Sequence, residues 1–308
     1  MEMLYQRDIY GKTLVELGKQ NKDIVVLDAD LSGSTRTSFF AKEFPERFFN
    51  FGVAEQNMMA TAAGLASCGK TVFVSTFAVF ATGRAWDQVR NTVCYNNFNV
   101  KIVATHAGIT VGEDGSSHQA LEDIALMRII PNMKIIVPCD GPQTRDAVIT
   151  AVKIPGPFYI RLGRAKFPTV EAKKEFEFGK AQVLKQGSDV TLIACGLMVC
   201  FALEASEILA KEGVDAGIIN LHTLKPFDKE AVMKAVVKTR RLVVCEEHSI
   251  CSGLAACIDE VISRDYTAKI ARVGIKNVFG QSGSAKELLE EYGLTTQDIV
   301  KAARSLIR

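Results

Sequence analysis

Three stretches in the first half of the sequence carry side chains whose types and spacing could do chemistry. The first, residues 51–58 (FGVAEQNM), places Glu55 among apolar residues at the start of a segment rich in Ala and Gly. Apolar surroundings desolvate a carboxyl group and allow it to share a proton with a bound base. A glutamate in the first turn of a helix also complements the helix dipole, so a purely structural role stays open.

The second stretch, residues 75–80 (STFAVF), ends a predicted strand and carries Phe77 and Phe80 three positions apart. Two such rings can stack a flat heteroaromatic group, each contributing ~0.5–1.5 kcal/mol beyond the area that it buries. Taken alone, two aromatic residues in an apolar run are more often part of the core. The pair therefore indicates a binding site only together with the other two stretches.

The third stretch, residues 105–119 (THAGITVGEDGSSHQ), contains His106 and His118, two of the four histidines in the chain. An acidic pair, Glu113 and Asp114, and three glycines lie between them. The stretch follows a predicted strand, and ligands of open α/β sheets bind outside the carboxyl ends of the strands. Solvated loop histidines are the structural alternative, but a polar loop between two apolar segments favours a binding or catalytic site.

Apolar strands alternate with helical patterns along the whole chain, which predicts βαβ units and parallel sheets. We expect an α/β fold of two domains, each a mostly parallel sheet flanked by helices. A charged stretch at 165–178 indicates the boundary, with domains at 1–168 and 181–308 and a linker at 169–180. The predicted strands are 24–27, 72–75, 100–105, 134–137, 158–161, 190–194, 216–220, 242–245 and 269–272. The predicted helices are 55–68, 84–96, 144–152, 199–212, 229–239, 252–263, 285–291 and 296–307.

Composition excludes several classes of protein. The chain has 308 residues, 48% of them hydrophobic and 23% charged, which is typical of a globular protein. A formal net charge of +2 argues against a nucleic-acid binder. No apolar run approaches the ~20 residues that cross a bilayer, and residues 1–12 lack the apolar segment of a signal peptide, so we expect no membrane contact and a cytoplasmic location. Eight cysteines without a C-x-x-C pair indicate reduced thiols, and no clustered spacing predicts a metal site in this chain.

In this order and at these separations, the three stretches resemble the pyrimidine-binding domain of transketolase, a thiamine-diphosphate enzyme. The motifs GVAEQN at 52–57 and GEDGSSHQ at 112–119 carry the resemblance. The remainder, including FGQS at 279–282 and YGLT at 292–295, resembles the transketolase C-terminal domain. The diphosphate-binding domain of the family, with its G-D-G metal motif, has no counterpart here. The resemblance therefore implies the C-terminal half of a split transketolase.

The same resemblance implies roles around the cofactor. Glu55 matches the acid that hydrogen-bonds the aminopyrimidine ring and promotes the proton relay to the thiazolium carbon. Phe77 and Phe80 match the surface that stacks the pyrimidine, although Gly83 stands where family members often carry a further aromatic residue. Asp30 matches an aspartate near the cofactor.

The resemblance also implies a set of residues that contact the sugar substrate. His106, Asp114 and His118 match the residues that contact the sugar, and both histidines count with Glu55 as catalytic candidates. Three further residues match those that hold the sugar phosphate: Arg7, Ser34 and Arg164. Arg161 lies three residues before Arg164 and competes for that role.

The implied activity is transfer of a two-carbon ketol unit from a ketose phosphate to an aldose phosphate, with pentose phosphates as the family default. Thiamine diphosphate would be shared with an N-terminal subunit that binds Mg²⁺ or Ca²⁺, in an α₂β₂ assembly. Three alternatives stay open: the beta subunit of a 2-oxo acid dehydrogenase-type decarboxylase, a 1-deoxyxylulose-5-phosphate synthase-like enzyme, and a non-catalytic α/β binding module. The histidines at both ends of the 105–119 loop favour transketolase.

Overall fold

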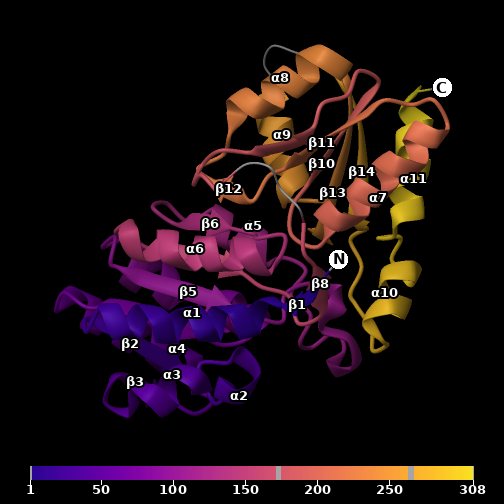
Figure 1. Ribbon diagram of the computed structural model, residues 1–308. Coiled ribbons are helices and arrows are strands. Elements are labelled where there is room, and N and C mark those ends of the chain that lie inside the picture. The colour runs from indigo at the N-terminus through magenta and orange to yellow at the C-terminus, as the bar shows by residue number, and fades with distance from the viewer. Residues whose placement is uncertain (1, 171–174, 263–266, 308) are drawn as a thin grey trace.

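The chain folds into two α/β units, each built on a mostly parallel sheet with helices on both faces (Figure 1). The structure is a computed structural model, and it describes residues 2–170, 175–262 and 267–307. The fold class expected from the alternation of strands and helices is confirmed. Among the described helices, none is long and apolar enough to cross a membrane.

The first unit is built on a seven-stranded sheet in the order β12-β6-β7-β5-β4-β2-β3, in which every pair except β12·β6 is parallel. Its central strands are buried along their full length, which explains why they read as continuous apolar runs. The strands are β2 (Ile24–Asp28), β3 (Phe48–Asn50), β4 (Thr71–Ser75), β5 (Val100–Ala104), β6 (Lys134–Ile136), β7 (Phe158–Arg161) and β12 (Thr223–Lys225).

Helices cover both faces of this sheet. On one face lie α1 (Gln6–Gln20), α3 (Ser38–Glu43) and α6 (Gly141–Lys153), and on the other α4 (Glu55–Ser67) and α5 (Asp123–Arg128). Helix α6 starts at an N-cap, because the Asp140 side chain accepts from the Gln143 amide at 2.8 Å and a proline lies in the first turn. Two short helices, α2 (Ser32–Thr35) and the 3-10 helix η1 (Pro45–Arg47), complete the loops after β2.

The region predicted as a helix at 84–96 is helical, but its turns are mostly π-helical, in the segments η2 (Phe80–Arg84) and η3 (Gln88–Cys94). Four fully buried side chains repeat here every four residues: Ala81, Ala85, Val89 and Val93. That period exceeds the 3.6 residues of an α-helix turn, and the wider π turns keep the row directed at the core that η2 and η3 share with α4. π turns are frequent at functional sites, and η2 begins at a predicted site residue, Phe80.

The second unit has a five-stranded sheet in the order β14-β13-β10-β11-β9, with only β9 antiparallel to its neighbour. The strands are β9 (Gln182–Lys185), β10 (Val190–Ala194), β11 (Ala216–Asn220), β13 (Arg241–Ser249) and β14 (Lys269–Ile275). The helices are α7 (Met198–Lys211), α8 (Lys229–Thr239), α9 (Leu254–Ile262), α10 (Ala285–Glu291) and α11 (Thr296–Ile307). They match the predicted helices closely, although residue 263, the predicted end of α9, lies outside the described residues.

Figure 1 shows α7 and α11 on one face of this second sheet and α8 and α9 on the other. A capping box starts α10, in which the Ser284 and Glu287 side chains each accept from the other residue's backbone amide. All eight cysteines are free thiols.

The two units share structure across the expected boundary. β12 leaves the second unit and pairs antiparallel with β6 at the edge of the first sheet (Figure 1). One apolar core runs from Ile135 of the first sheet to Ile193 and Leu254 of the second unit. A small two-stranded sheet, β1 (Met3–Tyr5) with β8 (Lys166–Pro168), lies at the junction, while residues 171–174 of the expected linker lie outside the described residues. The units therefore hold their relative positions through shared packing and pairing.

Candidate functional site

The predicted site residues follow the carboxyl ends of parallel strands in the first sheet. Glu55 comes after β3, Phe77 and Phe80 after β4, His106 after β5, and Arg164 after β7. Because the carboxyl ends of parallel strands meet at one edge, the topology gathers these residues from distant parts of the sequence.

Glu55 is the first residue of α4 and its side chain is only 2% exposed. Its Oε1 accepts a hydrogen bond from Arg84 Nη1 at 2.7 Å, and the Arg84 guanidinium lies 4.6 Å from the centroid of the Phe80 ring. Glu55 Oε2 is buried and has no hydrogen-bond partner among the residues that the structure describes. A buried carboxylate oxygen with no donor is costly, so this atom is suited to a ligand that brings a donor to it.

The aromatic rings form a second part of the site. Phe77 stacks on His106 with ring centroids 3.8 Å apart and an interplanar angle of 20°. Phe80 lies nearly parallel to Phe77 at 6.1 Å, and His118 meets Phe80 edge-on at 5.4 Å. Phe77 is 6% exposed, whereas Phe80 is half-buried. The four predicted ring residues are therefore brought together, with Phe80 the more accessible of the two phenylalanines.

His106 is held by both its backbone and its ring. A parallel bridge between Phe77 and Thr105 extends the pairing of β4 and β5, and His106 then turns with a positive φ of 58°. Its Nδ1 hydrogen-bonds the Thr105 hydroxyl at 2.9 Å. Burial, together with the nearby Arg7 and Arg164, lowers the pKa of His106 to about 3, so the ring is neutral near pH 7.

The rest of the loop is more open to solvent. It continues through the 3-10 helix η4 (Ile109–Asp114), where Asp114 is exposed, and returns through the half-buried His118. Ser117 Oγ lies 3.0 Å from His118 Nδ1. An exposed carboxylate and an accessible imidazole on one loop can reach the hydroxyl groups of a polar ligand.

Positive charge gathers beside this loop. Arg7 Nη1 donates to the backbone oxygen of Ser34 at 3.2 Å, and the Arg7 Nε is buried without a partner in the described part of the chain. Burial and the neighbouring Arg36 lower the pKa of Arg7, and Arg164 adds to the effect. Arg7, Arg36 and Arg164 lie close enough to interact, and guanidinium groups are suited to binding an anion such as a phosphate.

Two other predicted residues occupy different settings. Arg161 is buried, donates from Nε to Asp123 Oδ2 at 2.7 Å and is thereby committed to a structural ion pair, so it does not compete with Arg164. Arg164 pairs instead with the exposed Glu113 at 2.6 Å. Asp30 is exposed with a positive φ of 63°, and its backbone amide donates to the Asn50 side-chain oxygen at 3.0 Å. No contact in the described residues joins Asp30 to Glu55 or to the ring cluster.

Sequence reasoning missed three residues of this region. Arg84 and Arg36 looked like ordinary charged residues, since their partners Glu55 and Asp8 lie 29 and 28 positions away. Glu247, buried in β13 of the second unit, accepts from the Thr110 amide of the loop at 2.7 Å. Its signal was the acidic pair at 246–247 inside an otherwise apolar strand, where an unpaired carboxylate would be costly.

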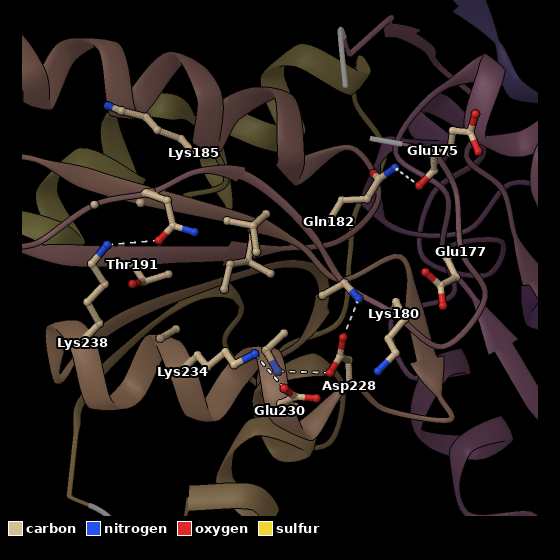
Figure 2. A pocket seen from close by; sticks show the side chains of 18 residues that line it. Glu175, Glu177, Lys180, Gln182, Lys185, Thr191, Asp228, Glu230, Lys234 and Lys238 are labelled. Carbon is tan, nitrogen blue, oxygen red and sulfur yellow. Dashed lines mark hydrogen bonds and ion pairs between the residues drawn. The ribbon is translucent and has the colours of Figure 1, made fainter. Parts of the chain in front are cut away.

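A separate cavity of about 470 Å³ lies in the second unit beside α8 (Figure 2). Four of its charged groups serve the fold: Lys234 pairs with Glu230 at 2.7 Å, Lys238 donates to Gln186, and Asp228 caps α8. Within the ranges that the structure describes, no three His, Cys, Asp or Glu side chains are grouped to hold a metal ion. The ring and arginine cluster is therefore the candidate site.

Comparison with known proteins agrees with this geometry. The family model for the transketolase pyrimidine binding domain matches residues 2–169, and that for the transketolase C-terminal domain matches residues 179–299. A protein of Methanocaldococcus jannaschii that carries the provisional name of a transketolase C-terminal section is 53% identical over 296 residues, covering 95% of this chain and 93% of that protein. A 6-deoxy-6-sulfo-D-fructose transketolase subunit of Clostridium sp. (strain MSTE9) is 40% identical, covering 99% of this chain and 95% of the relative.

Among solved structures, one described as a split gene transketolase, an inactive β4 tetramer, is similar over nearly the whole chain. It is 51% identical with a TM-score of 0.91, covering 99% of this chain and 100% of that one. Both sheets and the loops that carry the candidate site therefore have a counterpart in a protein of the same extent.

Proposed function

The chain belongs to the transketolase family and corresponds to its pyrimidine-binding and C-terminal domains, and we propose that it is the C-terminal subunit of a split transketolase. With its partner it would transfer a two-carbon ketol unit from a ketose phosphate to an aldose phosphate. Thiamine diphosphate, when bound, supplies the carbon nucleophile that carries this unit.

The observation that carries the proposal is the buried Glu55 Oε2, which has no partner in the described residues. An aminopyrimidine ring bound at this position would share a proton between one of its ring nitrogens and Glu55 Oε2, and the accessible face of Phe80 lies next to the same ion pair. Glu55 and Phe80 thus fit the pyrimidine half of thiamine diphosphate. Asp30 belongs to the same proposed contact set, whereas Phe77 lies behind the cofactor site and supports His106, on which it stacks.

The surroundings of the other polar side chains suggest their roles in proton transfer and sugar binding. Glu55 holds or releases a proton at Oε2, and Arg84 fixes the carboxylate through Oε1. His106, kept neutral, accepts or donates a hydrogen bond to a sugar hydroxyl, and His118 moves a proton at the more open side of the loop. Asp114 accepts from a further hydroxyl.

The anionic end of the sugar is assigned to the arginine cluster. Arg7 and Arg164 would bind the phosphate, with Ser34 beside them. The relative from Clostridium is named for a sulfonated sugar, which also carries an anion at this end of the molecule. A phosphorylated ketose and aldose, with pentose phosphates first, are the proposed substrates.

The diphosphate and its Mg²⁺ or Ca²⁺ are assigned to an N-terminal partner subunit. Two such half-sites related by two-fold symmetry give an α₂β₂ assembly with two active sites. The description of the split gene relative as an inactive β4 tetramer supports the proposal that this subunit is inactive alone.

Reconstitution tests the proposal. The chain is mixed with the N-terminal transketolase subunit from the same genome, thiamine diphosphate and Mg²⁺, and ketol transfer from xylulose 5-phosphate to ribose 5-phosphate is measured beside light scattering. We expect activity only in the mixture and a mass of two copies of each chain. Activity of this chain alone, or a fully active 1:1 heterodimer, would contradict the assembly.

A further inference from the structure

The second unit contacts the loop at residues 105–119, called the substrate-side loop below, near its centre. The Glu247 side chain of β13 is 4% exposed, and its Oε1 accepts from the Thr110 amide at 2.7 Å. These two residues are 137 positions apart in the sequence. Thr110 lies four residues beyond His106 in η4, so the bond fixes the turn that follows the histidine.

Gly108 makes this contact possible. Its φ is 83°, and a Cβ added there would lie 2.3 Å from the Glu247 carboxyl group. Only a residue without a side chain lets the loop backbone approach the carboxylate so closely. The backbone oxygen of Glu247 also accepts from Arg161 Nη2 at 2.9 Å, which ties the end of β7 to the same strand.

A second contact holds the far end of the loop. Gln119 Nε2 donates to the backbone oxygen of Gln281 at 2.9 Å, and a Cβ on Gly280 would come within 1.8 Å of Gln119 Oε1. The helix α10 packs against η4 on the same side. The loop from His106 to Gln119 is thus supported from the second unit at two points.

We propose that Glu247 is a positioning residue that holds the substrate-side loop through the Thr110 amide, and that the second unit thereby sets the geometry of His106 and His118. The consequence for sugar binding rests on the proposed function, whereas the anchoring of the loop does not. Glu247 itself touches neither substrate nor cofactor.

The neighbouring Glu246 supplies a matched control. It is 1% exposed, but its carboxylate accepts from the amides of Leu254 and Ala255 at 2.6 and 2.9 Å and so caps α9 instead of the loop. Both glutamates are buried in β13, and only one reaches the substrate side. Their removal should therefore loosen different segments.

Amide hydrogen exchange on the full chain tests the anchoring directly. We expect Glu247→Ala to speed exchange across residues 107–120 by at least about tenfold, with little change in α9, and Glu246→Ala to do the reverse. Glu247→Gln keeps an acceptor oxygen and should restore protection, whereas Glu247→Asp withdraws the oxygen and should not. Equal loosening of the loop by Glu246→Ala and Glu247→Ala, or no loosening by Glu247→Ala and Glu247→Asp, would overturn the proposal.

Kinetics of the reconstituted pair then test the consequence. Glu247→Asp and Glu247→Ala should raise KM for the sugar phosphates by about tenfold while KM for thiamine diphosphate stays unchanged, and Glu247→Gln should recover the wild-type values. Unchanged sugar KM in an active pair would remove the link to substrate binding. If the wild-type pair shows no ketol transfer, the proposed function fails and the exchange result still decides the anchoring.

Discussion

Arg84 and Glu55 form an ion pair of 2.7 Å in which the arginine is 46% exposed and the glutamate 2% exposed. The pair occupies one oxygen of the carboxylate and leaves the other without a partner in the described structure. It also places the guanidinium on the Phe80 ring, on the segment where Gly83 replaces the aromatic residue often found in the family. Arg84 therefore contacts both of the side chains that we propose for the pyrimidine ring, Glu55 and Phe80.

Exchanging Glu55 for Gln should lower kcat of the reconstituted enzyme by at least ~10²-fold, because the amide can accept from Arg84 but cannot relay a proton. The thermal unfolding midpoint should change little. Arg84→Met should instead cost stability, and the Glu55→Gln/Arg84→Met pair should show a coupling of about 1–2 kcal/mol. Additive stability effects in this double-mutant cycle would show that the ion pair does not hold the carboxylate.

Substitutions of Phe77 and Phe80 should raise KM for different ligands. Phe80→Leu removes the accessible ring beside Glu55 and should raise KM for thiamine diphosphate. Phe77→Leu removes the ring beneath His106 and should chiefly raise KM for the sugar phosphates, because the imidazole loses its 3.8 Å stacking partner. Steady-state kinetics with each component varied in turn measures both. An equal effect of the two changes on cofactor KM would assign both rings to the pyrimidine.

Substitutions of Arg161 and Arg164 should have different effects, one on stability and the other on substrate binding. Arg161→Met leaves the fully buried Asp123 without its ion-pair partner and should lower the free energy of unfolding by about 3–5 kcal/mol. Arg164→Met should leave unfolding within about 0.5 kcal/mol of wild type, because its ion pair is exposed, and should raise KM for phosphorylated sugars. Chemical denaturation measures the stability of both variants, and steady-state kinetics measures KM for the sugar phosphates. A wild-type KM in Arg164→Met would remove it from phosphate binding.

Acid should destabilise the subunit partly through its buried histidines. Burial lowers the pKa of His222 from 6.5 to about 4. Between pH 6.5 and 4 the unfolded chain binds a proton at His222 that the folded chain does not. The free energy of unfolding is therefore unaffected by His222 above pH 6.5 and falls as the pH drops toward 4. His222→Gln should therefore lose about 2–3 kcal/mol less stability than wild type between pH 7 and 4. An equal dependence of the free energy of unfolding on pH in the two proteins, measured by chemical denaturation, would contradict this.

The central strands of both sheets were predictable because their burial is visible in the sequence, whereas the short edge strands were not. The core strands β7, β10 and β11 match the predicted ranges, since a strand buried on both faces is a short apolar run. Helix α1 was not predicted, and its mixed surface gives a weak periodic signal. The strand β12 was not predicted either, because its partner β6 belongs to the other unit.

The candidate site was predictable only where residue types lie close in sequence. His106 and His118 share one loop, and Phe77 and Phe80 share one turn, so their grouping follows from spacing. The roles of Arg84 and Glu247 depend on contacts 29 and 137 positions away, which the fold alone creates. Local pattern cannot reveal such partners, although a buried acid in an apolar strand indicates that one exists.

Calorimetric titration of thiamine diphosphate tests most directly the claim that this chain supplies half of a shared site. The cofactor is titrated with Mg²⁺ into the chain alone, into its pair with the N-terminal subunit, and into the pair carrying Glu55→Gln. We expect weak binding to the chain alone, tight Mg²⁺-dependent binding to the pair, and weakened binding to the variant pair. Tight Mg²⁺-dependent binding to the isolated chain, or binding by the pair that Glu55→Gln leaves unchanged, would contradict the claim.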